Sequence, residues 1–182
     1  MTPAREGANS LDRRGQSRRA AASARLRNVR WHYRDPSLVW LFPSSYALHI
    51  LEEWFGGFPE WTATVAGSPL PREAFIVINV VAFAAMILAT RAAIQRESHG
   101  WMGIAIATVL LVNALVHILG SILTGSYSPG LVTGVVLYLP LAQLALMRAW
   151  NQAGNGMFGM GVAAGLGIHA LVVAIAYAVS TR

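Results

Sequence analysis

Long apolar runs fill most of this 182-residue chain, and they restrict its possible folds more than any other feature. Five runs follow the N-terminal segment, at about 37–55, 74–94, 101–123, 131–150 and 157–180. A helix needs about 20 apolar residues to cross the ~30 Å of hydrocarbon in a bilayer, and four runs are near or above this length. The first run is weaker, because it carries Pro43 and two glutamates. The sequence therefore predicts an all-α, polytopic transmembrane helical bundle of about five spans.

The composition supports a membrane class and divides the chain into two parts. Hydrophobic residues make up 55% of the chain and charged residues only 12%, whereas about a quarter of a soluble domain is charged. Nine of the 14 basic residues precede residue 35, so we expect residues 1–35 to be a basic, disordered cytoplasmic tail and residues 36–182 to be the transmembrane domain. The net charge of +6 is explained by this tail and predicts no nucleic-acid partner. The absence of cysteine excludes disulfides, thiolate metal sites and cysteine nucleophiles.

The distribution of arginines predicts the topology. With the N-terminus inside, 12 of the 14 arginines fall on the cytoplasmic side and only Arg72 and Arg182 lie outside. Positive charge is concentrated in this way on the cytoplasmic side of membrane proteins. We therefore expect a multi-pass membrane protein with its C-terminus outside and membrane lipid around it.

Two Gly-x-x-x-Gly pairs predict close helix contacts. They are formed by Gly130 and Gly134 and by Gly161 and Gly165. Such pairs let two helix backbones approach each other in lipid. Close packing inside one chain is the favoured interpretation, and a homo-oligomer held together through these faces is the alternative.

Polar residues within the apolar runs form the most informative pattern. Keeping a charged side chain at the bilayer centre costs about 2.5–3.5 kcal/mol on insertion scales, so such residues have a partner or a purpose. In the first run, Glu52 and Glu53 follow His49 by three and four positions and share its helix face. The other runs add Asn79, Asn113, His117, Tyr138 and His169. At about 1.5 Å per residue, these groups lie at similar depth, roughly 16–24 Å from the inner surface, which predicts one polar layer.

The residue types in this layer suit a divalent metal such as zinc or iron. The candidate ligands are His49, Glu53, His117 and His169. Polar support would come from Asn79, Asn113 and Tyr138. Glu52 or Glu53 would act as the general base, because an apolar setting makes a carboxylate more basic. The leading hypothesis is a metal-binding, hydrolase-like membrane enzyme that acts on a lipid or another membrane-accessible substrate.

Two other functions use the same residue types and stay open. The first is a proton- or ion-coupled transporter or channel subunit, in which the layer relays protons. The absence of paired discontinuous helices or repeats weakens this hypothesis. The second is a structural membrane protein whose polar cluster only fixes helix packing through hydrogen bonds.

The segment YALHILEEWFGGFPEW resembles the signature of the HXXEE-motif membrane proteins. The motif residues are His49, Glu52 and Glu53. The resemblance continues through Asn113 and His117 and through the stretch from Thr133 to Pro140. It implies a multi-pass protein of the plasma (inner) membrane of a bacterium, of uncharacterised function, and it supplies no activity, cofactor or substrate.

Overall fold

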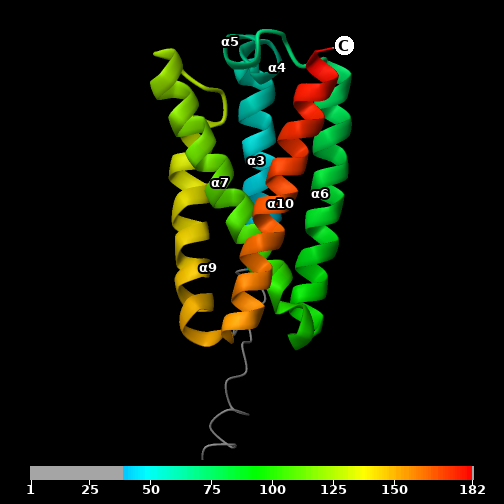
Figure 1. Cartoon of the computed structure of the whole chain (residues 1–182), viewed down its shortest axis with the longest axis vertical. Coiled ribbons are helices and arrows are strands. Elements are labelled where there is room, and N and C mark those ends of the chain that lie inside the picture. The colour runs from blue at the N-terminus through cyan, green and yellow to red at the C-terminus, as the bar shows by residue number, and fades with distance from the viewer. Residues whose placement is uncertain (1–38, 182) are drawn as a thin grey trace, which may run out of the picture. The chain divides into compact units, whose positions relative to one another are not determined.

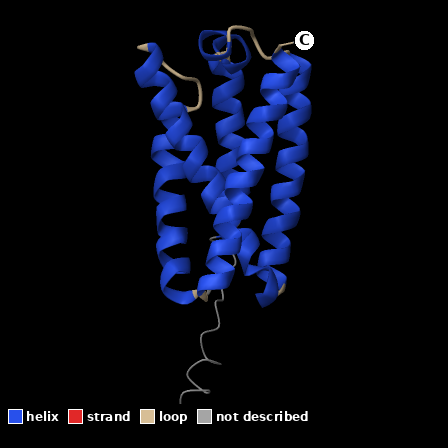
Figure 2. Ribbon diagram, in the orientation of Figure 1, coloured by secondary structure: helices blue, strands red, loops and turns tan. Residues whose placement is uncertain are grey.

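The computed structural model describes residues 39–181, and every regular element within them is helical (Figures 1 and 2). The helices are α3 (Leu41–Gly56), α4 (Phe58–Trp61), α5 (Ala63–Ala66), α6 (Arg72–Gln95), α7 (Gly100–Thr124), α8 (Leu131–Thr133), α9 (Leu139–Gln152) and α10 (Asn155–Ser180). A 3₁₀ turn (Glu97–His99) precedes α7, and a π-helical turn (Gly134–Tyr138) joins α8 to α9. The predicted all-α fold is confirmed, whereas the predicted tail, residues 1–35, lies outside the described residues.

Four helical segments of the described chain are long and apolar enough to cross a membrane. They cover Arg72–Gln95, Glu97–Thr124, Leu131–Gln152 and Asn155–Ser180. These segments indicate a multi-pass membrane protein. The 16 residues of α3 fall short of the ~20 that a full crossing needs. A fifth span and the orientation of the termini therefore remain predictions.

Helix α7 is the central helix of the described bundle and packs against α6, α9 and α10. The contact with α10 depends on two glycines. A Cβ atom at Gly161 would lie 2.6 Å from Cβ of Ile104, and one at Gly165 would lie 2.6 Å from the carbonyl oxygen of Ala105. The backbones of α7 and α10 can therefore approach only because both positions lack a side chain. The second predicted glycine pair thus serves packing inside the chain, and association of copies stays a prediction.

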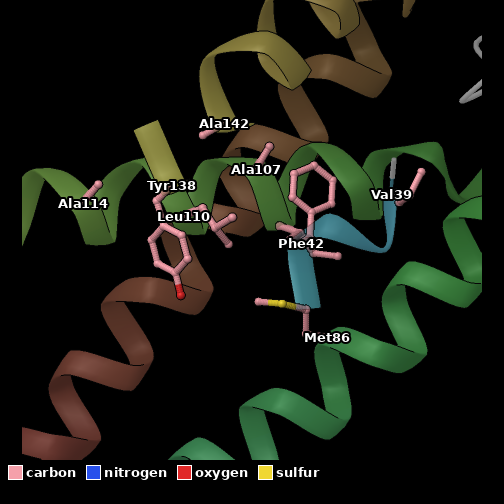
Figure 3. Packing of buried hydrophobic residues seen from close by; sticks show 9 residues of the cluster. Val39, Phe42, Met86, Ala107, Leu110, Ala114, Tyr138 and Ala142 are labelled. Carbon is pink, nitrogen blue, oxygen red and sulfur yellow. The ribbon is translucent and has the colours of Figure 1, made fainter. Parts of the chain in front are cut away.

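An apolar core fills the bundle around the first half of α3. Figure 3 shows side chains from α3, α6, α7 and α9 meeting in this cluster. Its buried members are Val39, Phe42, Met86, Ile106, Ala107, Leu110, Ala114, Tyr138 and Ala142. The cluster ends at Tyr138, whose ring also touches the first histidine of the polar layer. The apolar core and the polar layer are therefore continuous.

Candidate metal centre

Two helices bring three ionisable side chains together inside the bundle. His49 and Glu53 lie one turn apart on α3 and are 1% and 6% exposed, and His117 of α7 is 2% exposed. The Oε1 atom of Glu53 lies 3.5 Å from Nε2 of His49 and 3.3 Å from Nε2 of His117. The two imidazole rings meet edge to face, with their centroids 5.0 Å apart. One carboxylate oxygen thus faces two imidazole nitrogens in a space closed to solvent.

The spacing of these atoms suits a single metal ion. Each of the three residues offers one ligand atom, and these atoms all lie within 4.8 Å of one another. Ligand atoms that share a tetrahedral zinc ion at about 2.0–2.1 Å are separated by roughly 3.3 Å. The side chains therefore need to shift little to enclose an ion between them.

Hydroxyl groups hold the outer nitrogens of both imidazoles. Nδ1 of His49 lies 2.7 Å from Oγ1 of Thr133, and Nδ1 of His117 lies 2.9 Å from Oγ of Ser128. Metal-binding histidines are usually oriented in this way, by a hydrogen bond at the nitrogen that does not bind the metal. Both rings consequently direct Nε2 toward Glu53.

The turn between α7 and α8 covers the two imidazoles. Gly130 in this turn has φ +104°, and a Cβ atom there would lie 2.6 Å from Cε1 of His117 and 2.8 Å from Cε1 of His49. Only glycine adopts this backbone conformation readily, and only glycine leaves room for both rings. The backbone of the turn therefore closes the centre directly.

Glu52 faces this turn and is not part of the three-residue group. Its carboxylate accepts backbone N–H bonds from Gly130 (3.1 Å), Val132 (2.9 Å) and Thr133 (2.7 Å). It also accepts short hydrogen bonds from the hydroxyls of Tyr127 and Thr133. The free N–H groups at a helix start attract a negative charge, so Glu52 anchors the first turn of the segment that begins with α8. Its oxygens are committed to this contact rather than free to act as a general base.

His49 and Glu53 therefore belong to the converging group, whereas Glu52 between them contacts the turn after α7. The family described as "Protein of unknown function with HXXEE motif" matches residues 40–145, more than half of the chain. The chain belongs to the HXXEE-motif family. The matched region contains α3, α6, α7 and α8 and therefore the whole centre. No curated protein and no solved structure matches the chain.

A local change of helix type completes the HXXEE centre. Thr133 and Tyr138 both contact His49, the first through its hydroxyl and the second through its ring, at a centroid distance of 4.4 Å. Five positions along an α-helix differ by about 140° in direction. In the π-helical turn between them hydrogen bonds join residues five apart, which brings their directions closer together, and such turns recur at functional sites. Tyr138 thereby lies against His49 through its ring, but its buried hydroxyl has no hydrogen-bond partner among the described residues, so its predicted role as polar support stays a prediction.

The other predicted residues lie outside this group. Asn79 accepts a hydrogen bond from the hydroxyl of Tyr46 (2.7 Å) and donates one to the carbonyl of Phe75 (3.0 Å), so it joins α3 to α6. Asn113 is partly buried, and its Oδ1 atom has no partner within residues 39–181. His169 is partly buried on α10 and is not in the group whose ligand atoms converge.

Two residues of the centre, Thr133 and Ser128, are not among those predicted from the sequence. Ser128 lies within the sequence Tyr-Ser-Pro-Gly (127–130) and Thr133 follows it by three residues; this sequence is typical of a tight turn. Their hydroxyls would have been candidates had the turn been placed over the histidines.

Proposed function

We propose that this HXXEE protein is a membrane metalloprotein that binds one divalent ion, zinc or iron, through His49, Glu53 and His117. The observation that carries the proposal is the Nε2 atom of His49, which is buried and has no hydrogen-bond partner in the described structure. Buried polar atoms nearly always have a partner. A metal ion between this nitrogen and Glu53 supplies one.

The donor set also fits such an ion. Two imidazole nitrogens and one carboxylate oxygen suit zinc, and the same three donors bind iron(II) in oxygenases. The ligands are neutral imidazole and carboxylate, so the ion offsets the buried negative charge of Glu53. Hydrogen bonds between both Nδ1 atoms and hydroxyls supply the orientation that metal-binding histidines require.

Three protein ligands leave a coordination position for water or substrate, which is typical of catalytic rather than structural metal sites. When bound, such an ion activates water or polarises a carbonyl or phosphoryl oxygen. The substrate we infer is a lipid or another membrane-accessible molecule, and an apolar groove between α3 and α6 offers a place for an apolar chain, although no residue of the three-residue group lines it. The groove is lined mainly by Ile50, Leu51, Trp54, Phe75, Ile76 and Val80.

A proton relay is the second candidate, because Glu53 lies between two imidazoles. Hydrogen bonds run from His49 through Thr133 to Glu52 and on to exposed Tyr127, which gives the relay one exit. In the opposite direction the described chain presents the apolar core around Leu110. The relay therefore lacks a second exit within the described residues, and the metal proposal is favoured.

Metal analysis of the detergent-purified protein tests the proposal. After loading with Zn²⁺ or Fe²⁺ and removal of excess ion, we expect one equivalent in the wild type and none in His117→Ala. The matched control is His169→Ala, which removes an intramembrane histidine outside the group and should retain the ion. A wild type without stoichiometric metal overturns the proposal. Proton flux in proteoliposomes that disappears in Glu53→Gln would favour the relay instead.

A further inference from the structure

We propose that Glu52 and Thr133 are positioning residues that fix His49 in the tautomer able to bind a metal ion. The inference rests on the proposed function and assigns the middle glutamate of the motif a role in the same centre. Glu52 touches neither His49 nor the space between the ligand atoms, so it acts through Thr133.

The first step is the protonation state of Glu52. Five groups contact its two oxygens: three backbone N–H groups, which can only donate, and the hydroxyls of Tyr127 and Thr133, which can donate or accept. A carboxylate accepts hydrogen bonds at both oxygens, whereas a protonated carboxyl group must donate one. The three N–H donors, which lie at both oxygens, therefore favour the ionised form of Glu52, and the ionised form accepts from both hydroxyls.

The second step is the direction of the hydrogen bond between Thr133 and His49. Thr133 has a single hydroxyl proton, and it is donated to Glu52. The carbonyl of Gly130, 3.4 Å from the same hydroxyl, is also an acceptor. Because the proton is used on this side, the Thr133 oxygen can only accept from Nδ1 of His49, 2.7 Å away.

The third step follows from imidazole chemistry. A neutral histidine carries one ring proton, so a proton on Nδ1 leaves a lone pair on Nε2. Nε2 of His49 is the buried, unpartnered atom that faces Glu53. The opposite tautomer would donate a proton from Nε2 toward Glu53 and block the metal. Glu52 and Thr133 therefore keep the ligand atom ready before any ion arrives.

Substitutions at Thr133 and Glu52 disturb the hydrogen bond to His49 in two different ways. Thr133→Val keeps the shape of the side chain and removes the acceptor for Nδ1–H, whereas Thr133→Ser keeps the hydroxyl and serves as the matched control. Glu52→Gln should reverse the direction of the hydrogen bonds that join His49, Thr133 and residue 52. Its amide NH₂ best replaces Oε2, which meets one hydroxyl and one N–H, rather than Oε1, which meets three donors. The NH₂ group would then donate to Thr133, and the Thr133 proton would turn to Nδ1 of His49.

The experiment is nitrogen-15 NMR of the metal-free, full-length protein in lipid bilayers with labelled histidine, followed by Zn²⁺ titration of the same samples. The His49 signals are assigned by their loss in His49→Gln. In the wild type and Thr133→Ser we expect a protonated Nδ1 and an unprotonated Nε2. In Glu52→Gln and Thr133→Val we expect Nε2 to gain the proton and Zn²⁺ affinity to fall about 10–100-fold, the usual cost of losing such a supporting partner.

The outcomes separate the two proposals. A wild type that binds Zn²⁺ but carries the His49 proton on Nε2 overturns the tautomer assignment and leaves the metal proposal intact. Wild-type affinity in both Glu52→Gln and Thr133→Val does the same. If the wild type shows the assigned tautomer but binds no ion, the metal proposal fails. The purpose inferred for the hydrogen bonds of Glu52 and Thr133 then fails with it. Because the NMR measurement needs no metal, these results cannot be confused.

Discussion

Helices α3 and α7 and the segment from α8 to α9 build two different interiors. Around the first half of α3 they bury apolar side chains such as Phe42, Leu110 and Ala142. Two to three turns further along α3 and α7 they bury His49, Glu53 and His117. A buried ionic group is often no more stabilising than apolar residues of the same volume. The difference indicates that the apolar interior maintains the fold, and it supports the proposal that the polar interior is retained for metal binding.

The largest effect is expected for two substitutions on α7, one in the apolar interior and one in the polar interior. Leu110 and His117 lie two turns apart on the buried face of α7. His117→Ala should abolish stoichiometric metal binding, because two ligands cannot hold the ion tightly. Leu110→Ala should cost about 2–5 kcal/mol of unfolding free energy by leaving a cavity and should keep the metal. Metal analysis and denaturant unfolding in detergent measure both quantities. Loss of the ion in Leu110→Ala at a temperature where that variant is folded would contradict the division.

The sequence predicts the long apolar helices and part of the polar interior. Span lengths and helix type follow from hydrophobic runs, because lipid requires every backbone group to be paired within the segment. The pairing of His49 with Glu53 follows from their spacing of four. His117 could be placed near them only by its depth in the bilayer.

The depth of a residue in the bilayer gives its position along the membrane normal but not within the membrane plane, so the sequence could not show which polar residues meet. His169 shares the predicted depth but lies on α10, outside the converging group. A π-helical turn lies between Thr133 and Tyr138, which both contact His49, and this departure from α-helical geometry has no marker in the composition. The role of Glu52 depends on where the turn after α7 folds back, which neighbouring residues in the sequence do not reveal.

A pair of glycines tests the comparison at the backbone. An added Cβ would lie 2.6 Å from a neighbouring atom at both Gly130 and Gly161, but the neighbour is an imidazole in the first case and Ile104 in the second. Overpacking of this kind costs about 1–3 kcal/mol, so both alanine variants should unfold at lower temperature. Only Gly130→Ala should also weaken metal binding, because it displaces His117 and His49. Equal metal affinity in the two variants would show that the turn does not position the ligands.

The contact between α3 and α6 sharpens the boundary of the polar interior. Tyr46 donates a hydrogen bond to Asn79 one turn before His49 on α3. Tyr46→Phe should cost about 0.5–1.5 kcal/mol of unfolding free energy, the net value of one hydrogen bond, and leave metal affinity unchanged. Thermal unfolding and Zn²⁺ titration check the two expectations. A tenfold or larger loss of affinity would extend the centre to Asn79.

The smallest expected effect concerns the exposed end of the polar interior. Burial and the hydrogen bond to Glu52 raise the pKa of Tyr127 from 10.0 to about 12. Because the folded-state pKa lies above the unfolded one, the contribution of Tyr127 to stability is complete below about pH 10 and is lost as the pH rises through about 12. Tyr127→Phe should therefore have a lower free energy of unfolding than the wild type at neutral pH, and this free energy should fall less steeply as the pH rises. Tyrosinate absorbance follows the titration directly. If the absorbance curves of the wild type and Tyr127→Phe are the same near this pKa, Tyr127 does not hold Glu52.

Metal binding should not change in Tyr127→Phe. The metal should remain bound at neutral pH, because the four remaining donors keep Glu52 ionised and the Thr133 hydroxyl directed toward it.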